Sequence, residues 1–83
     1  MKIQVIGPGC VNCRRLYAQT QRALAQAGMD VELEKVENHH DIMATGVWMT
    51  PGLAIDGEVK SSGRIPQVPE IVSWLMTAAA REA

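Results

Sequence analysis

The sequence predicts an α/β fold in which a mixed four-stranded β-sheet is flanked by helices. Three observations predict it. Short apolar segments alternate with longer stretches in which apolar residues recur at helical spacing. The first two short segments are joined by a helix, which makes them parallel with a right-handed crossover. The last two are joined by Asp56-Gly57, a strong hairpin signal because a type I′ turn needs positive φ at both central residues. The expected order is β-α-β-α-β-β-α.

The N-terminal half contains a strand, a helix and a second strand. The first strand runs from Lys2 to Ile6 and ends at the breaker Gly7-Pro8-Gly9. A helical stripe follows, and Gly28 is a plausible C-terminal stop. Apolar and charged residues alternate from Met29 to Val36, which predicts a strand with one partly solvated face. The helical stripe consists of Leu16, Thr20, Ala23, Leu24 and Ala27.

The C-terminal half contains a short helix, a hairpin and a long helix. Asn38 is a candidate N-cap for the short helix, with Asp41 as a weak capping-box partner. Pro66 and Pro69 fit only in the first turn of the long helix. The expected elements are a helix over His39–Thr45, strands over Leu53–Ile55 and Glu58–Ser61, and a helix over Gln67–Ala80.

The length and charge of the chain exclude several classes of protein. Its 83 residues predict a single domain, residues 1–83. Eight Lys+Arg against nine Asp+Glu give a net charge of −1, so we expect neither a nucleic-acid partner nor binding to an anionic membrane. No apolar run approaches the ~20 residues that span a bilayer, so we expect no membrane insertion. Met1-Lys2-Ile3 leads directly into an alternating segment, so we expect no signal peptide and a cytoplasmic protein.

The two cysteines, Cys10 and Cys13, indicate chemistry rather than scaffolding. A small secreted disulfide scaffold usually carries more cysteines. A bridge across so short a loop stabilises a fold by about 2 kcal/mol, against about 4.7 kcal/mol for a loop of about 100 residues. The pair is also half of a zinc site, but the chain has no second pair. His39 and His40 would have to complete it, although adjacent helical residues point in different directions. We expect surface histidines, no metal and no cofactor.

The position of Cys10-Val11-Asn12-Cys13, between a strand and a helix, favours a reactive thiol. Residues three apart in a first helical turn have Cα atoms roughly 5–6 Å apart, within the range of a disulfide. Free N–H groups and the helix dipole favour a thiolate at Cys10, whose pKa is then expected to fall below the usual ~8.5. Arg14 and Arg15 add positive charge nearby and are candidates for tuning this pKa. Cys13, one turn in, is expected to be more buried.

These properties predict thiol–disulfide exchange. The Cys10 thiolate attacks a disulfide of a partner protein and forms a mixed disulfide. Cys13 then attacks the Cys10 sulfur, which releases the reduced partner and leaves Cys10 and Cys13 oxidised. Run backwards, the same steps oxidise a dithiol. Cys10 and Cys13 are therefore the candidate catalytic residues.

Over essentially its whole length the chain resembles the thioredoxin-fold family, and within it the small, glutaredoxin-sized redox-active disulfide proteins of archaea and bacteria. The resemblance is carried by Gly7-Pro8-Gly9 and the cysteine motif, Thr50-Pro51, Asp56-Gly57, and Ser62-Gly63 with Pro66. It implies that Pro51 is a cis proline opposite the cysteines and that the backbone of Thr50 pairs with an extended substrate segment. The candidate substrate-binding residues are Gly9, Val11, Asn12, Thr50 and Pro51.

Some positions depart from the common thioredoxin pattern. Gly9 stands where thioredoxins carry Trp, and Val11-Asn12 stands where they carry Gly-Pro. Thioredoxins place a buried acid on the strand that leads to the motif, whereas Gln4 lies six residues before Cys10 and cannot act as a base. Since no glutathione-binding set is evident, we expect protein disulfides as substrates and a flavoprotein disulfide reductase or similar protein as electron donor.

Two other functions fit part of the sequence. Copper chaperones also place CxxC after a first strand, but their order is β-α-β-β-α-β and they carry Met two residues before the first cysteine, where this chain has Pro8. A non-catalytic thioredoxin-fold adaptor would instead use the Thr50-Pro51 edge to bind partners. Disulfide reduction that is lost in Cys10→Ser would support the redox function. Stoichiometric Cu(I) uptake without turnover would support the chaperone.

The remaining aromatic and acidic residues have structural interpretations. Trp48 and Trp74 are interpreted as packing residues, although Trp48 is close enough to Thr50-Pro51 to line the rim of the site. Tyr17, one turn beyond Cys13, suits either packing or covering the site. Three glutamates are interpreted as a solvated strand edge: Glu32, Glu34 and Glu37.

Overall fold

The computed structural model describes residues 1–82 and confirms the predicted order of elements over that range. Their bounds follow the chain: β1 (Ile3–Ile6), α1 (Val11–Ala27), β2 (Leu33–Val36), α2 (His39–Ala44), β3 (Gly52–Ile55), β4 (Glu58–Ser62) and α3 (Val68–Glu82). Within this described range, no helix combines the length and the apolar character needed to span a membrane.

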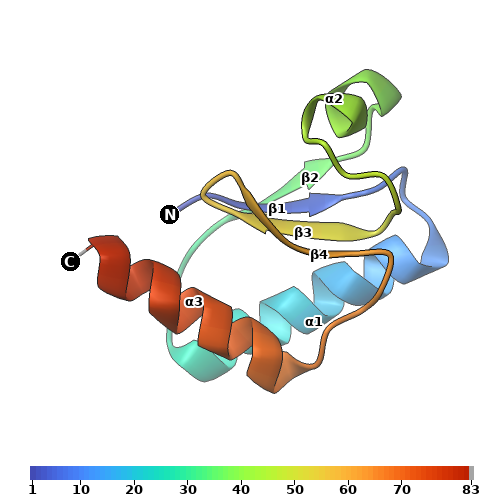
Figure 1. The fold of residues 1–83 in the computed structure, drawn as a ribbon. Coiled ribbons are helices and arrows are strands. Elements are labelled where there is room, and N and C mark those ends of the chain that lie inside the picture. Colours follow the sequence, from blue (N-terminus) through green and yellow to red (C-terminus); the bar gives the residue numbers. More distant parts are fainter. Residues whose placement is uncertain (83) are drawn as a thin grey trace.

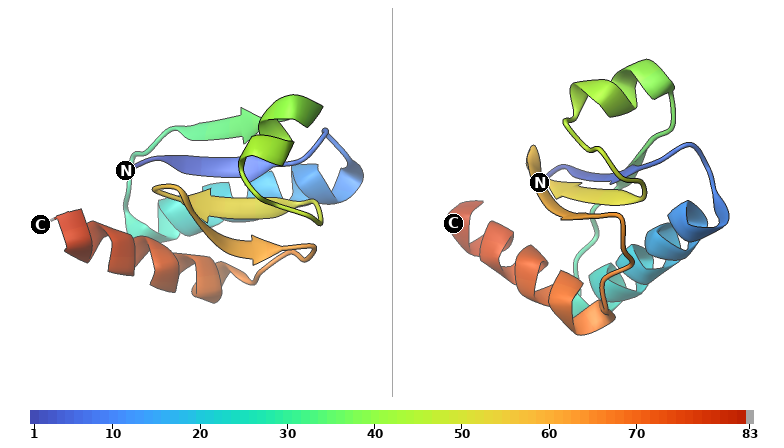
Figure 2. Two further views of the ribbon diagram at one scale, coloured as in Figure 1. Left: turned by 45° about the horizontal axis from the view of Figure 1, so that its top comes forward. Right: turned by 45° about the vertical axis from the view of Figure 1, so that its right-hand side comes forward.

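The strands form one mixed sheet in the order β2-β1-β3-β4. β1 is parallel to β2 and antiparallel to β3, and β3 and β4 form the antiparallel hairpin. Asp56 (φ 52°) and Gly57 (φ 81°) supply the positive φ values that the predicted turn requires. Helices α1 and α3 cover one face of this sheet, whereas α2 lies over the other (Figure 1), and the rotated views in Figure 2 show the same division.

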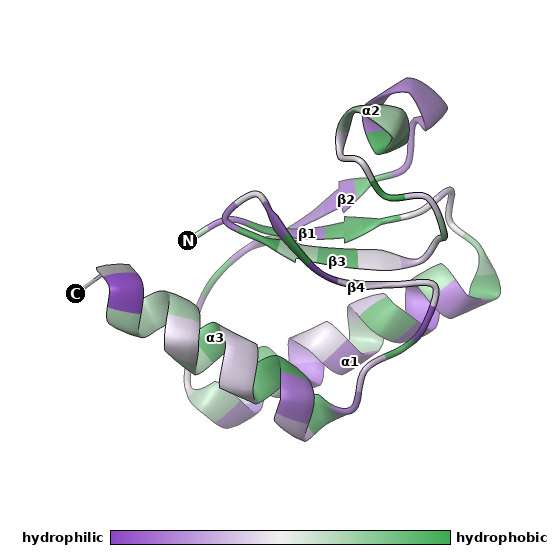
Figure 3. Ribbon diagram, viewed as in Figure 1, coloured by the Kyte–Doolittle hydropathy of each residue, from purple (hydrophilic) through white to green (hydrophobic). Residues whose placement is uncertain are grey.

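Apolar side chains gather on both faces of the sheet. The larger core lies between the sheet and the helices α1 and α3, and Figure 3 shows apolar residues on β1 and β3 and a mixture of apolar and polar residues along these two helices. The smaller core lies beneath α2 and includes Ile6, Val36 and Val47. Successive strand residues point to opposite faces, so Val5 belongs to the larger core and its neighbour Ile6 to the smaller one.

The second strand is shorter than predicted. It begins at Leu33 rather than Met29, because β1 is four residues long and its parallel register pairs Ile3 with Leu33. The residues before Leu33 therefore have no strand to pair with, and Met29 and Val31 pack against the larger core instead. Their apolar character, which suggested a longer strand, reflects burial beside the sheet.

The start of the last helix also differs from the prediction in one residue. Pro69 lies in the first turn of α3, as expected, but Pro66 precedes the helix and is fully buried. Glu70 accepts a hydrogen bond from the Gln67 N–H (3.2 Å) and forms an ion pair with Arg64 (2.9 Å). These contacts satisfy a backbone donor at the helix start and join the preceding loop to the first turn of the helix.

Candidate active site

Cys10 and Cys13 form a disulfide at the N-terminus of α1. Cys10 is the N-cap, with extended backbone (φ −66°, ψ 169°), and the Cys13 N–H donates to Cys10 Sγ at 3.1 Å. The two Cα atoms are 4.9 Å apart. Cys10 is exposed, whereas Cys13 is 5% exposed. The predicted position at a helix N-terminus and the predicted difference in burial are therefore both confirmed.

Two glycines form the turn that carries the chain from β1 to these cysteines. The Gly7 N–H donates to the Val36 carbonyl at 2.9 Å, which extends the contact between β1 and β2 by one residue. A Cβ atom at Gly7 would overlap Cys13 Sγ. Gly9 has φ 89°, a conformation that residues with side chains rarely adopt, and a Cβ there would lie 3.0 Å from Glu37 Oε2. Both positions therefore require a residue without a side chain.

The segment before β3 lies beside the cysteines. A Cβ at Gly7 would be in van der Waals contact with Thr50 Cβ (3.6 Å), so Gly7 lies between Cys13 and Thr50. Thr50 is exposed, Pro51 is buried, and the peptide bond between them is cis. The Gly63 N–H donates to the Pro51 carbonyl at 2.9 Å. Figure 1 shows the β1–α1 turn and the α2–β3 loop at the same end of the sheet.

The interpretation of Trp48 as a packing residue is wrong, because its side chain is 96% exposed. Its neighbour Val47 is the residue that enters the smaller core, and the chain then turns Trp48 outward. Val11 and Met49 are also largely exposed (56% and 65%), so apolar side chains accompany the exposed Cys10 and Thr50 in both segments that form the site. Trp74, by contrast, is half-buried and packs against the larger core as predicted.

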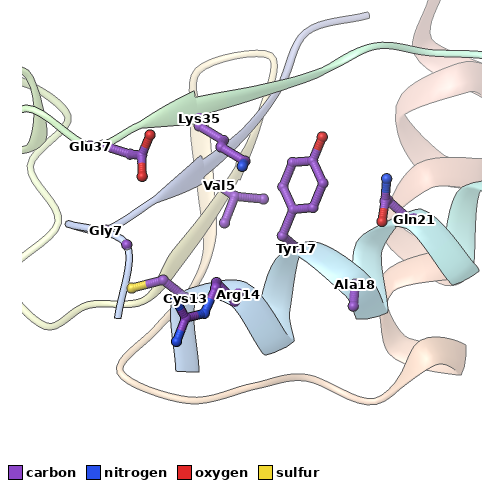
Figure 4. Close-up of a pocket in the computed structure, with 10 residues that line it drawn as sticks. Val5, Gly7, Cys13, Arg14, Tyr17, Ala18, Gln21, Lys35 and Glu37 are labelled. Carbon is purple, nitrogen blue, oxygen red and sulfur yellow. The ribbon is translucent and has the colours of Figure 1, made fainter. Parts of the chain in front are cut away.

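A pocket of about 320 Å³ opens beside the buried cysteine (Figure 4). It lies between α1 and the sheet, and three charged side chains line it: Arg14 from α1, Lys35 from β2 and Glu37, which follows β2. The Lys35 ammonium lies 4.7 Å from the centre of the Tyr17 ring. Arg15 is exposed and is not among the lining residues. The full lining is Val5, Gly7, Gly9, Cys13, Arg14, Tyr17, Ala18, Gln21, Lys35 and Glu37.

Glu37 is exposed, as expected, but its place beside Gly9 in this pocket was not predicted. The signal was present in the alternation along β2. Lys35 pairs in register with Val5, which faces α1, and Glu37 follows two residues later on the same face. The intervening Val36 enters the smaller core on the other face.

Gln4 is not near the cysteines. Its side chain donates to Glu34 Oε1 at 3.4 Å and lines a different pocket with Val36 and Ala54, on the α2 side of the sheet. Counting six residues back from Cys10 therefore identifies a residue on the face opposite α1. On β1 it is Val5, together with Gly7 beyond the strand, that lies beside Cys13.

The histidines lie apart from the cysteines. His39 and His40 are exposed in α2, over the opposite face of the sheet from α1. Throughout residues 1–82, no three or more His, Cys, Asp and Glu side chains gather as a metal-ligand group.

A CxxC disulfide at the N-terminus of the first helix, on a sheet of order β2-β1-β3-β4 with helices on both faces, defines a redox protein of the thioredoxin-fold class. A family model described as a thioredoxin domain matches residues 1–76. The chain is 42% identical over 71 residues to a thioredoxin of Methanothermobacter thermautotrophicus, covering 86% of this chain and 92% of that protein. It is 38% identical over 69 residues to a thioredoxin of Methanocaldococcus jannaschii, covering 83% and 79% respectively.

The chain therefore belongs to the thioredoxin-domain family, and it is a thiol–disulfide oxidoreductase with a CxxC centre. The copper-chaperone alternative is wrong in its fold, because α2 separates β2 from β3, whereas in the order β-α-β-β-α-β the third strand follows the second without a helix.

Proposed function

We propose that Cys10 is the attacking sulfur and Cys13 the resolving sulfur in the reduction of protein disulfides. The observation that carries the assignment is the difference in exposure: Cys10 is open to solvent and Cys13 is 5% exposed. A partner protein reaches the first sulfur directly, whereas the second is reached from within the chain. The N-terminal N–H groups of α1 favour negative charge at Cys10, and α1 has no acidic residue in its first turn.

The reaction proceeds in two exchanges. The Cys10 thiolate attacks one sulfur of the partner disulfide, forming a bond between Cys10 and that sulfur and releasing the other partner sulfur as a thiolate. Cys13 loses its proton and attacks Cys10 Sγ, which breaks the mixed disulfide. The partner leaves with two reduced sulfurs, each of which takes up a proton, and the chain holds the disulfide seen in the structure. A second dithiol then reduces the chain by the same steps in reverse.

The substrate site in this proposal is the surface around Cys10. Gly9, Val11 and Asn12 flank the sulfur, and Thr50 and Pro51 supply the facing backbone edge. An extended segment of a partner protein pairs with this edge by backbone hydrogen bonds. The exposed ring of Trp48 adds an apolar contact for a side chain of the same segment.

Of the two arginines expected to tune the site, Arg14 is the one that acts on the cysteines. Both are exposed, but Arg14 lines the pocket beside Cys13 and Arg15 does not. A guanidinium is positively charged at all ordinary pH values and stabilises a thiolate close to it.

Proteins with accessible disulfides are the substrates, and a flavoprotein disulfide reductase or similar protein supplies the electrons. The reaction takes place in the cytoplasm, where such reductases keep thiols reduced. Residues 1–83 act as one domain, a proposal supported by the family match over residues 1–76.

Reduction of insulin disulfides with dithiothreitol as the electron donor tests the proposed function. The parent chain is expected to accelerate precipitation of the insulin B chain, and Cys10→Ser is expected to remove the acceleration entirely. Arg15→Gln, a surface change on the same helix, serves as the control and keeps the activity. A parent chain that binds insulin without accelerating its reduction would instead indicate the non-catalytic adaptor.

A further inference from the structure

The resolving step requires Cys13 to lose a proton in a buried position. The thiol and not the thiolate is the stable form of a cysteine away from water, and the thiolate is the form that attacks a disulfide. Cys13 is 5% exposed, and on β1 its neighbours are Val5 and Gly7, neither of which ionises. β1 therefore offers no proton acceptor for Cys13, and we look for one on the other elements that line the pocket.

The pocket beside Cys13 contains one side chain suited to this role. The titratable side chains that line it, besides Cys13, are Arg14 and Tyr17 from α1, Lys35 from β2 and Glu37 just beyond β2. At neutral pH, arginine, lysine and tyrosine hold their protons, whereas a glutamate is ionised and accepts one. Figure 4 shows the Glu37 carboxylate at the same end of the pocket as Gly7 and Cys13.

The surroundings of Glu37 leave its carboxylate available. A Cβ atom added at Gly9 would lie 3.0 Å from Glu37 Oε2, so the carboxylate lies beside the turn that leads into Cys10. No hydrogen bond or ion pair holds it among the residues that the structure describes, whereas Glu34, Glu58 and Glu70 are all paired with cations. The pocket volume of about 320 Å³ exceeds the ~30 Å³ that one water occupies in the liquid, so water can connect the two side chains.

We propose that Glu37 accepts the Cys13 proton, through water in this pocket, as Cys13 resolves the mixed disulfide. This inference rests on the proposed roles of the two cysteines. The proton passes from Cys13 Sγ to the Glu37 carboxylate, the Cys13 thiolate forms its bond to Cys10 Sγ, and the partner sulfur leaves with the electron pair of the broken bond. In the reverse reaction, protonated Glu37 returns the proton to Cys13 as the Cys10–Cys13 bond breaks. Lys35 and Arg14 supply positive charge that favours the Cys13 thiolate after it has lost its proton and before it bonds to Cys10.

A chromogenic disulfide separates the two exchanges. When 5,5′-dithiobis(2-nitrobenzoate) is supplied in smaller amount than the reduced chain, attack by Cys10 releases one thionitrobenzoate, and attack by Cys13 releases the second. Glu37→Gln removes the proton acceptor and keeps the size of the side chain. We expect the first phase to match the parent within about twofold and the second phase to slow about tenfold at neutral pH. The deficit shrinks as the pH is raised, because hydroxide then removes the thiol proton without the carboxylate.

Two further variants separate this role from a structural one. Glu34→Gln removes a carboxylate from the same strand, but Glu34 faces the α2 side and contacts Gln4 and Lys2, so both phases are expected to match the parent. Glu37→Asp keeps a carboxylate and is expected to restore part of the second-phase rate and the parent's pH dependence. A Glu37→Gln chain whose second phase matches the parent in rate and pH dependence overturns the inference. Failure of the proposed function gives a different result, because Cys13→Ser would then still release the second thionitrobenzoate at the parent's rate, independent of chain concentration, whereas attack by a second chain depends on that concentration.

Discussion

Gly7 occupies a position in which the Cys13 sulfur leaves no room for a side chain. A Cβ at Gly7 would overlap Cys13 Sγ and would also contact Cys13 Cβ at 3.4 Å. Because the Gly7 N–H is bonded to Val36 and the backbone before it is part of β1, the turn cannot move away without disturbing the sheet. The close approach of β1 to α1 at the disulfide thus depends on glycine, which has no side chain, at this one position.

Gly7→Ala is therefore expected to destabilise the chain by about 1–3 kcal/mol, the usual range for a methyl group forced into a packed site. The cost should be smaller in a Cys13→Ala background, because the sulfur that clashes is absent. Urea unfolding of the two single variants, the double variant and the parent, all in the reduced state, measures the coupling. Equal costs of Gly7→Ala in the two backgrounds would show that the sulfur is not the obstacle.

The exposure of the two cysteines predicts unequal reactivity. In the reduced chain, iodoacetamide is expected to modify Cys10 at least about tenfold faster than Cys13, because Cys10 is exposed at a helix N-terminus and Cys13 is buried. Quenched labelling followed by peptide mass spectrometry gives both rates in one sample. In urea the two rates should converge, which provides the control. Similar rates in the folded chain would contradict the assignment of roles.

Trp48 is expected to act on protein substrates and not on the chemistry. Trp48→Ala should raise KM for insulin about three- to tenfold with little change in kcat, because an exposed ring contributes to binding a partner and does not touch the sulfurs. Reaction with a small disulfide should be unchanged. Trp74→Ala is the matched comparison: that ring packs against the larger core, so the variant should lose stability and keep KM. Unchanged KM in Trp48→Ala would remove Trp48 from the proposed substrate surface.

The ion pairs of the C-terminal half predict a loss of stability in acid. Hydrogen bonds from the Arg64 guanidinium and then from the Gln67 N–H lower the pKa of Glu70 below its ordinary value of 4.5. Folding therefore favours the ionised carboxylate. This contribution is present above the unfolded pKa and is lost as the pH falls through the lower, folded one. Glu58, whose pKa is lowered first by the Lys60 hydrogen bond and then by that of Arg81, acts in the same direction.

Glu70→Gln should accordingly flatten the decrease in urea midpoint as the pH is lowered from about 5 to about 3. Its effect on activity at neutral pH should be small, because Glu70 lies at the start of α3 and not among the residues that line the cysteine site. Glu32→Gln, a change at an exposed glutamate before β2, is the control and should retain the parent's acid dependence. An unchanged acid dependence in Glu70→Gln would show that its pairs contribute nothing measurable.

Most of the fold could be predicted because its signals are local. The helical stripe from Leu16 to Ala27, the Asp56-Gly57 turn and the Gly28 stop each depend on a few neighbouring residues, and the structure shows all three. The error in the length of β2 has a non-local origin. Alternation from Met29 onward suggested a strand, but the number of residues that pair is set by β1, which lies far away in the sequence.

The site, too, has features that local sequence predicts and features that depend on distant residues. The position of the cysteines at a helix N-terminus and the burial of Cys13 follow from the CxxC motif and its neighbours. The exposure of Trp48 and the place of Glu37 do not. Trp48 points outward because Val47 is the residue that enters the smaller core, and Glu37 reaches Gly9 because β2 lies beside β1 in a particular register. Both depend on how distant segments meet.

Capture of a substrate tests the central claim, the division of roles between the two sulfurs, most directly. Cys13→Ser retains the attacking sulfur and lacks the resolving one, so incubation with oxidised insulin should yield a covalent complex through Cys10. The complex should be visible on a non-reducing gel and dispersed by dithiothreitol. Cys10→Ser, treated in the same way, should yield none. A complex that forms equally well through Cys13, or a Cys13→Ser chain that turns over like the parent, would contradict the account.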